Sequence, residues 1–152
     1  MSYYHILEKI KTELVADPFT NTITKGDLAS VDISKNTIFP LTHMIVNGAS
    51  FREDIISYSI SILSMDVVDF SKEETTDKFI GNDNEDDILN TQISLLNRLY
   101  EKLRRGNLYD DNYQVEGSPT LEPFTDRFEN VLAGWTLNLT IIVPNEMTVC
   151  DV

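Results

Sequence analysis

The sequence has a single cysteine and few basic residues, and both shortages restrict what the protein can be. Cys150 has no second cysteine with which to form an internal disulfide, which is the pattern of a chain made in a reducing cytosol. Only 12 lysines and arginines stand against 25 aspartates and glutamates, so the formal net charge is −13. Proteins that bind nucleic acid neutralise its phosphates with basic side chains. This charge balance instead favours solubility, repulsion of DNA or docking to a basic partner.

Long apolar runs and targeting signals are also lacking. No segment approaches the roughly 20 apolar residues that a membrane helix needs, and Met1–His5 lacks the basic and apolar regions of a signal peptide. We therefore expect no membrane association, and synthesis in the cytoplasm. Hydrophobic residues make up 41% of the 152, enough for one core, so the prediction is a single domain over residues 1–152.

Motifs for catalysis or cofactor binding are lacking as well. The sequence contains no Gly-rich phosphate loop, no HExxH and no CxxC. Its two histidines, His5 and His43, fall on a predicted helix and a predicted strand, where we expect structural roles. The sequence therefore predicts a protein that is not an enzyme and that takes no cofactor and no metal.

An acidic cluster before the second predicted helix is the candidate partner-binding segment. Its residues are Asp77, Asp83, Glu85, Asp86 and Asp87. A calcium-binding EF-hand loop starting at Asp83 would need Gly at its sixth position and Glu at its twelfth. Those positions hold Ile88 and Ser94. The expected role is a solvated helix start that compensates the helix dipole, with weak Ca²⁺ binding as the alternative.

Apolar residues at helical spacing predict two helices. The first covers Tyr3–Ala16, and Asp17–Pro18 ends it because a residue before proline is pushed out of the helical region. The second runs from about Glu85 to Arg105, with leucines along one stripe. Acidic residues at its start and basic residues at its end complement the helix dipole.

Alternation of apolar and polar residues predicts two long strands in one sheet, Ile56–Val68 and Ala133–Val143. The apolar row of the first strand slips by one residue at Leu63–Ser64, and a β-bulge is the simplest account. Leu108–Phe128 is predicted to be irregular, with short extended segments. The remaining expectations are extended pieces at Thr22–Thr24, Leu28–Ile33 and Ile38–Val46, and a turn at Asn47–Gly48.

These elements predict an α+β fold, because no regular βαβ alternation is present. We expect an antiparallel sheet with strands of mixed length, and an N-terminal helix and one long central helix packed on one face. Two rows of polar but uncharged residues accompany the long strands: Ser57, Ser59 and Ser61, and Thr136, Asn138 and Thr140. A sheet face of that kind is either solvated or packed on a neighbouring subunit.

The order of elements along the chain is shared with a known family. An N-terminal helix and small strands are followed by Asn47–Phe51, which leads into a strand ending at Met65–Asp69, and then by the long helix. Phe124–Asn130 then leads to Leu132–Ile141. In this order, over most of its length, the chain resembles the tail terminator (tail-completion) proteins of long-tailed bacteriophages.

This resemblance implies a structural virion protein of the tail or neck. Members of the family form a ring, usually a hexamer, that caps the growing tail tube and joins the tail to the head connector. The implied partners are further copies of this chain, the tail tube protein and the head connector or neck proteins. DNA passes through the lumen without specific binding, and an acidic chain suits a lumen that repels phosphates. The family has no catalytic residues to carry over.

Three other functions remain open from the sequence. The first is another head–tail neck, head-completion or sheath-associated protein. The second is an acidic inhibitor or immunity-type binding protein, or a DNA mimic, that blocks a basic site on an enzyme. The third is an enzyme whose cleft the sequence does not reveal. Ring formation would separate a tail terminator from an inhibitor, which is usually a monomer or dimer.

The segment Ser71–Asp87 provides a prediction about dynamics. Its charge density and its lack of an apolar pattern before Ile88 predict an exposed loop that becomes ordered when a partner binds. Hydrogen exchange on the isolated protein should therefore be fast along this segment. Strong protection throughout Ser71–Asp87 in the free protein would contradict the prediction.

Overall fold

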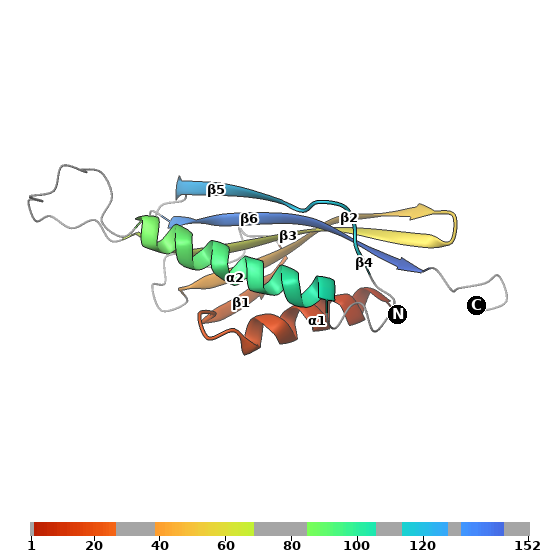
Figure 1. The fold of residues 1–152 in the computed structure, drawn as a ribbon, viewed down its shortest axis with the longest axis horizontal. Helices are drawn as coiled ribbons and strands as arrows, with labels where there is room; N and C mark the ends of the chain where they lie inside the picture. Colours follow the sequence, from red (N-terminus) through yellow and green to blue (C-terminus); the bar gives the residue numbers. More distant parts are fainter. Residues whose placement is uncertain (1, 27–38, 69–84, 106–113, 128–131, 145–152) are drawn as a thin grey trace, which may run out of the picture.

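The computed structural model describes residues 2–26, 39–68, 85–105, 114–127 and 132–144. These residues form an α+β fold (Figure 1). In chain order its elements are α1 (Ser2–Ala16), β1 (Thr22–Lys25), β2 (Leu41–Arg52), β3 (Ile55–Val67), α2 (Glu85–Arg105), β4 (Gln114–Val115), β5 (Thr120–Arg127) and β6 (Leu132–Pro144). Both helices have the ranges that the periodicity predicts, except that α1 begins one residue earlier.

The described strands form one mixed sheet in the order β1-β2-β3-β6-β4, and β5 pairs with β6 as well. All pairings are antiparallel except that between β1 and β2, which is parallel. The prediction of a purely antiparallel sheet is therefore wrong at β1. A parallel pair needs a crossover of a dozen or more residues, and the chain from Gly26 to Pro40 is long enough. The predicted extended piece Leu28–Ile33 lies outside the described residues.

The two long predicted strands are confirmed as neighbours in one sheet. β3 and β6 pair in continuous register from Ile55 with Pro144 to Val67 with Leu132. The segment predicted to be irregular contains β4 and the eight-residue β5. Both of these strands lie along the outer side of β6. The two helices, the central strands and this outer row enclose the core.

The predicted bulge at Leu63–Ser64 is wrong. Pairing of β3 with β6 continues through both residues without a register shift. Because alternate side chains of a strand point to opposite faces, the apolar row changes faces at Leu63. Leu63 and Met65 there join Phe39, Leu41 and Leu132 in a second buried cluster on the side away from the helices. The slip in the sequence marks the start of this second cluster.

The predicted turn at Asn47–Gly48 is also wrong. β2 continues to Arg52, and the hairpin turns at Glu53–Asp54, where Asp54 has a φ of 63°. Aspartate tolerates this left-handed conformation better than most residues. The register of β2 with β3 shifts between Val46 and Gly48, so Asn47 is the extra residue of a bulge. Asn47 and Gly48 therefore belong to a bulge within β2 and do not form a tight turn.

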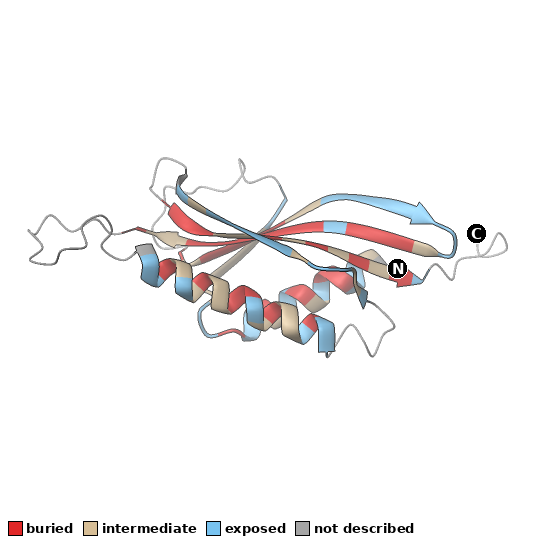
Figure 2. Ribbon diagram, turned by 45° about the horizontal axis from the view of Figure 1, so that its top comes forward, coloured by how far each residue is buried: buried red, intermediate tan, exposed pale blue. Residues whose placement is uncertain are grey.

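Both helices lie along the same side of the sheet (Figure 1), and side chains from both enter one hydrophobic cluster with the sheet. α1 contributes Ile6, Ile10 and Leu14, and α2 contributes Leu95, Leu96, Leu99 and Leu103. Ile60, Ile62 and Leu137 are among the sheet residues that they meet. Figure 2 shows the resulting pattern, with buried residues on the inner sides of the helices and along the central strands.

A partly buried ion pair links the end of α1 to α2. Arg98 donates from Nε to Asp17 Oδ2 at 2.8 Å and from Nη2 to Oδ1 at 3.1 Å. Burial alone would raise the pKa of the Asp17 carboxyl, but these bonds and one from the Phe19 N–H more than offset it. The pKa of Asp17 therefore lies below its usual value.

Aspartate in place of Ile60 or Leu137 should unfold the domain. Both side chains are almost fully buried, and an unpaired buried carboxylate costs several kcal/mol, comparable with the total stability of about 5–15 kcal/mol of a small protein. Ser59→Asp is the matched control, because Ser59 is exposed on the opposite face of the same strand. Thermal melting followed by circular dichroism measures the effect. Ile60→Asp and Leu137→Asp proteins that melt like Ser59→Asp would contradict the assigned faces.

Asp17→Asn should lower the free energy of unfolding at neutral pH by about 1.5–3 kcal/mol, the range for a hydrogen bond to a charged group. The folded-state pKa of Asp17 lies below the unfolded value of about 3.9, so its stabilisation is complete above that pH. It is lost as the pH falls through the folded-state pKa. Urea titrations from pH 7 to pH 2 should thus show the difference from wild type shrinking in acid. The control is Glu8→Gln, whose exposed pair with Lys11 contributes little.

Candidate interaction face

One part of the sheet surface away from the helices is made of uncharged polar residues, and we call it the polar face. It consists of Gly48, Ser50, Ser57, Ser59, Ser61, Asn138 and Thr140, of which Ser57 and Ser61 are buried, and the half-buried Ile142 lies beside Ser57 on the same face. Ser59 pairs with Thr140 on one side and Gly48 on the other, and Ser61 pairs with Asn138. The two predicted polar rows therefore lie side by side. Thr136, the last predicted member, pairs with Leu63 where the second cluster begins.

A chain of hydrogen bonds fixes the polar face at its centre. Asn47, the bulged residue, donates from Nδ2 to Ser61 Oγ at 2.7 Å. Ser61 Oγ in turn donates to Asn138 Oδ1 at 2.7 Å. These bonds connect β2, β3 and β6 through side chains alone. The network holds amide and hydroxyl groups in fixed positions without using an ionised group.

An ion pair closes the polar face at the end nearest the hairpin turn. Arg52 at the end of β2 reaches Glu116 after β4, with 3.3 Å between Nη2 and Oε1. Both residues line a hollow of about 300 Å³ together with Gly48, Ala49, Ser50, Ser57, Ser59 and Thr140. Ser57 Oγ is buried and has no hydrogen-bond partner within the described chain. The hollow therefore combines hydroxyl groups with one neutralised pair of charges.

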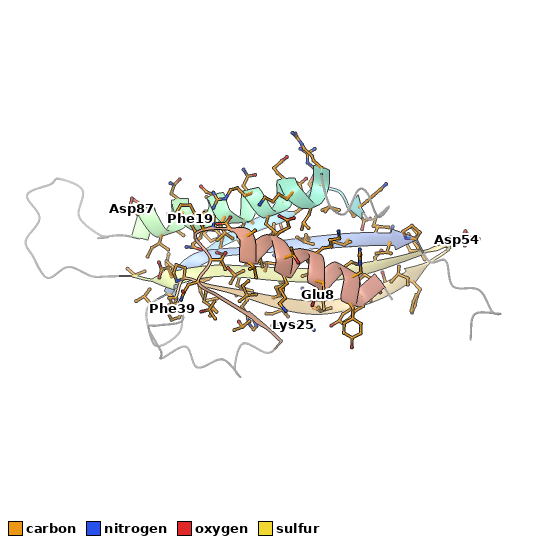
Figure 3. The ribbon with its side chains drawn as sticks, turned by 90° about the horizontal axis from the view of Figure 1, so that it is seen from below. Glu8, Phe19, Lys25, Phe39, Asp54 and Asp87 are labelled. Atoms are coloured by element: carbon orange, nitrogen blue, oxygen red, sulfur yellow. The ribbon has the colours of Figure 1, made fainter. Side chains whose placement is uncertain are left out.

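The described members of the predicted acidic cluster lie elsewhere. Asp77 and Asp83 are outside the described residues. Glu85 begins α2, and Asp86 and Asp87 are exposed in its first turn, as expected for a solvated helix start. Figure 3 places Asp87 and Asp54, in the hairpin turn beside the polar face, at opposite ends of the molecule. The structure therefore does not bring Asp86 and Asp87 to the polar face.

His43 has a structural role, as predicted. It is fully buried in β2, its Nδ1 lies 2.6 Å from Thr24 Oγ1, and its Nε2 lies 2.8 Å from the carbonyl oxygen of Gly26. Since a carbonyl can only accept, Nε2 carries the proton, and the Thr24 hydroxyl donates to Nδ1. The ring thus ties β1 to β2 and has no nitrogen left for a proton transfer or a metal.

Two described carboxyls have shifted pKa values, and neither shift comes from a second carboxyl. Burial raises the pKa of Asp66, partly offset by a hydrogen bond from the Val67 N–H. Asp17 is paired with Arg98. Within the described ranges, no group of three or more His, Cys, Asp or Glu residues could hold a metal ion. No described helix is long and apolar enough to cross a membrane.

The pairing of Arg52 with Glu116 and the bulge at Asn47 were not predicted from the sequence. Arg52 and Glu116 are far apart in the chain, and neither belongs to a periodic pattern. Asn47–Gly48 gave a signal, but the same dipeptide is typical of turns. The sequence held one clue: Arg52 is the only charged residue of the segment Leu41–Arg52, in a chain of net charge −13.

Comparison of the chain with protein-family models and with curated proteins finds no match to either.

Proposed function

We propose that this chain is a structural subunit of a closed ring, and that the ring is the tail terminator of a long-tailed bacteriophage. In this role it caps the tail tube, joins the tail to the head connector and lets DNA pass through its lumen. It performs no catalysis and takes no cofactor. The observation that carries the proposal is the uncharged polar face on a chain of net charge −13.

Electrostatics supports a docking role for the polar face. On a chain of net charge −13, a partner protein docks best on a surface without ionised groups, because no carboxylate then has to be buried unpaired. The side chains of the polar face are uncharged, and Arg52 and Glu116 at its border neutralise each other. Hydroxyl and amide groups can bond across an interface without leaving an unpaired charge buried. We assign this face to the tail tube protein.

The acidic remainder of the surface suits a channel for DNA. Glu53 and Asp54 in the hairpin turn and Asp86 and Asp87 on α2 are exposed. Carboxylates facing a lumen repel phosphates and so prevent DNA from binding as it passes. The ring is therefore expected to have no affinity for DNA at physiological salt.

Two alternatives use the same surfaces. Another head–tail neck or completion protein would also form rings, but it would bind the connector in preference to the tail tube. An acidic inhibitor or immunity-type protein would use exposed carboxylates such as Asp86 and Asp87 against a basic site. Because the second alternative predicts a monomer or dimer, the mass of the assembled protein separates it from both ring-forming functions.

Electron microscopy and native mass measurement of the purified protein, alone and mixed with its tail tube subunit, test the proposal. We expect closed rings, most simply hexamers, that sit on tube ends. Removing the protein from the phage should give tails of uncontrolled length or filled heads without tails. Ser59→Glu should reduce capping of tubes at least tenfold, since it places a charge at the centre of the polar face.

Thr12→Glu is the matched control for Ser59→Glu, because it adds the same charge at an exposed position on α1. It should cap tubes as the wild type does. A protein that stays monomeric at high concentration and never caps tubes would overturn the tail terminator proposal in favour of an inhibitor. Rings that bind a connector and ignore tubes would indicate a neck protein.

A further inference from the structure

The outer edge of β2 is uncovered beyond Met44 in the part of the chain that the structure describes. β1 pairs with Leu41–Met44 and ends there. The residues from Gly48 to Arg52 are all exposed (Figure 2), and the hairpin turn that follows them lies beyond the ends of both helices (Figure 1). Phe51 is 80% exposed. This edge offers main-chain donors and acceptors together with an aromatic side chain.

The sequence does not protect this edge against pairing with another strand. Natural edge strands are usually blocked by charges, prolines or covering segments, because an open edge pairs with other chains. Ile45–Phe51 contains no charged residue and no proline, and Arg52 is the first charge. The bulge at Asn47 lies before the stretch Gly48–Arg52 and leaves that stretch regularly paired with β3. An unprotected edge of this kind is expected where a partner strand adds.

The opposite edge of the same sheet is protected along most of its length. Pro119 and Pro123 lack the N–H that a neighbouring strand would need, and Gly117 turns the backbone with a φ of 59°. The stretch Gln114–Glu116, which comes before these residues, contains no proline. Pairing at this edge is therefore confined to the part around β4.

The uncovered stretch of β2 and the stretch around β4 lie at the same position along the direction of the strands. Ser50 pairs with Ser57, Ser57 with Ile142, and Ile142 with Gln114. Both β2 and β6 are antiparallel to β3, so they run in the same direction, and β4 runs opposite to them. Placed side by side in a continuous sheet, Gly48–Ser50 and Gln114–Glu116 of another copy would be antiparallel and would need no shift along the strands.

We infer that neighbouring copies in the proposed ring pair edge to edge, Gly48–Ser50 of one copy running antiparallel to Gln114–Glu116 of the next. The inference rests on the proposed function and specifies its contact between subunits. The pairing is head to tail, so it repeats around a ring when the rotation closes. Neighbouring polar faces become continuous and stay open for the tail tube.

Disulfide trapping between two differently substituted chains tests the pairing. Both chains carry Cys150→Ser; one carries Ser50→Cys and the other Gln114→Cys, both at exposed positions. Opposite residues of antiparallel strands have Cα atoms about 4.5–5.5 Å apart, within the range of a disulfide. Mixing and mild oxidation should give the disulfide-linked pair of chains. Thr120→Cys replaces Gln114→Cys in the control, since it is exposed on the same side of the same edge beyond Gly117.

We expect the 50–114 disulfide to form at least tenfold faster than the 50–120 disulfide, and Phe51→Ser to weaken self-association about tenfold, the loss expected for one partly buried aromatic side chain. Closed rings without this preference, and with Phe51→Ser assembling normally, would overturn the edge pairing and leave the ring proposal intact. The 50–114 disulfide in open chains or filaments would support the pairing and overturn the closed ring. Neither association nor the disulfide would overturn both.

Discussion

The continuous pairing of β3 with β6 is the constraint on which the other parts of the structure depend. These strands pair from end to end without a register shift, so every side chain on them has a fixed face. Ile60 and Ile62 must then face the helices, and Leu63 and Met65 must face away. Since no bulge intervenes, the sheet has to bury apolar residues on both faces, at different points along its length. The polar face occupies what remains of the helix-free side.

Charge and hydrogen bonding divide the surface in a way that follows from this arrangement. One face of the sheet packs against α1 and α2 through the hydrophobic core, and the outer sides of the two helices are solvated. The polar face carries no ionised group, and its network from Asn47 through Ser61 to Asn138 uses neutral donors and acceptors only. Arg52 and Glu116 neutralise each other where the face ends. A highly acidic chain thus keeps one ordered surface without ionised groups.

The sequence predicted the two helices, the two long strands and the polar rows because each follows a local period. Leu96, Leu99 and Leu103 repeat at helical spacing, and Ser57, Ser59 and Ser61 repeat at strand spacing. It failed where one local pattern fits two structures. Asn47–Gly48 suits a turn or a bulge, and the slip at Leu63–Ser64 suits a bulge or a second cluster. Choosing between them needs the neighbouring strands, which period and propensity do not specify.

The sequence by itself therefore determined the fold class, the acidic character of the chain and the alternation that separates polar from apolar residues. Tertiary structure alone decided that β1 is parallel to β2, that Arg52 meets Glu116, and that Asp17 is held by Arg98. The reason is physical: propensity and periodicity act between residues a few positions apart. Contacts between distant residues depend on how whole strands and helices pack, because only packing brings those side chains within bonding distance.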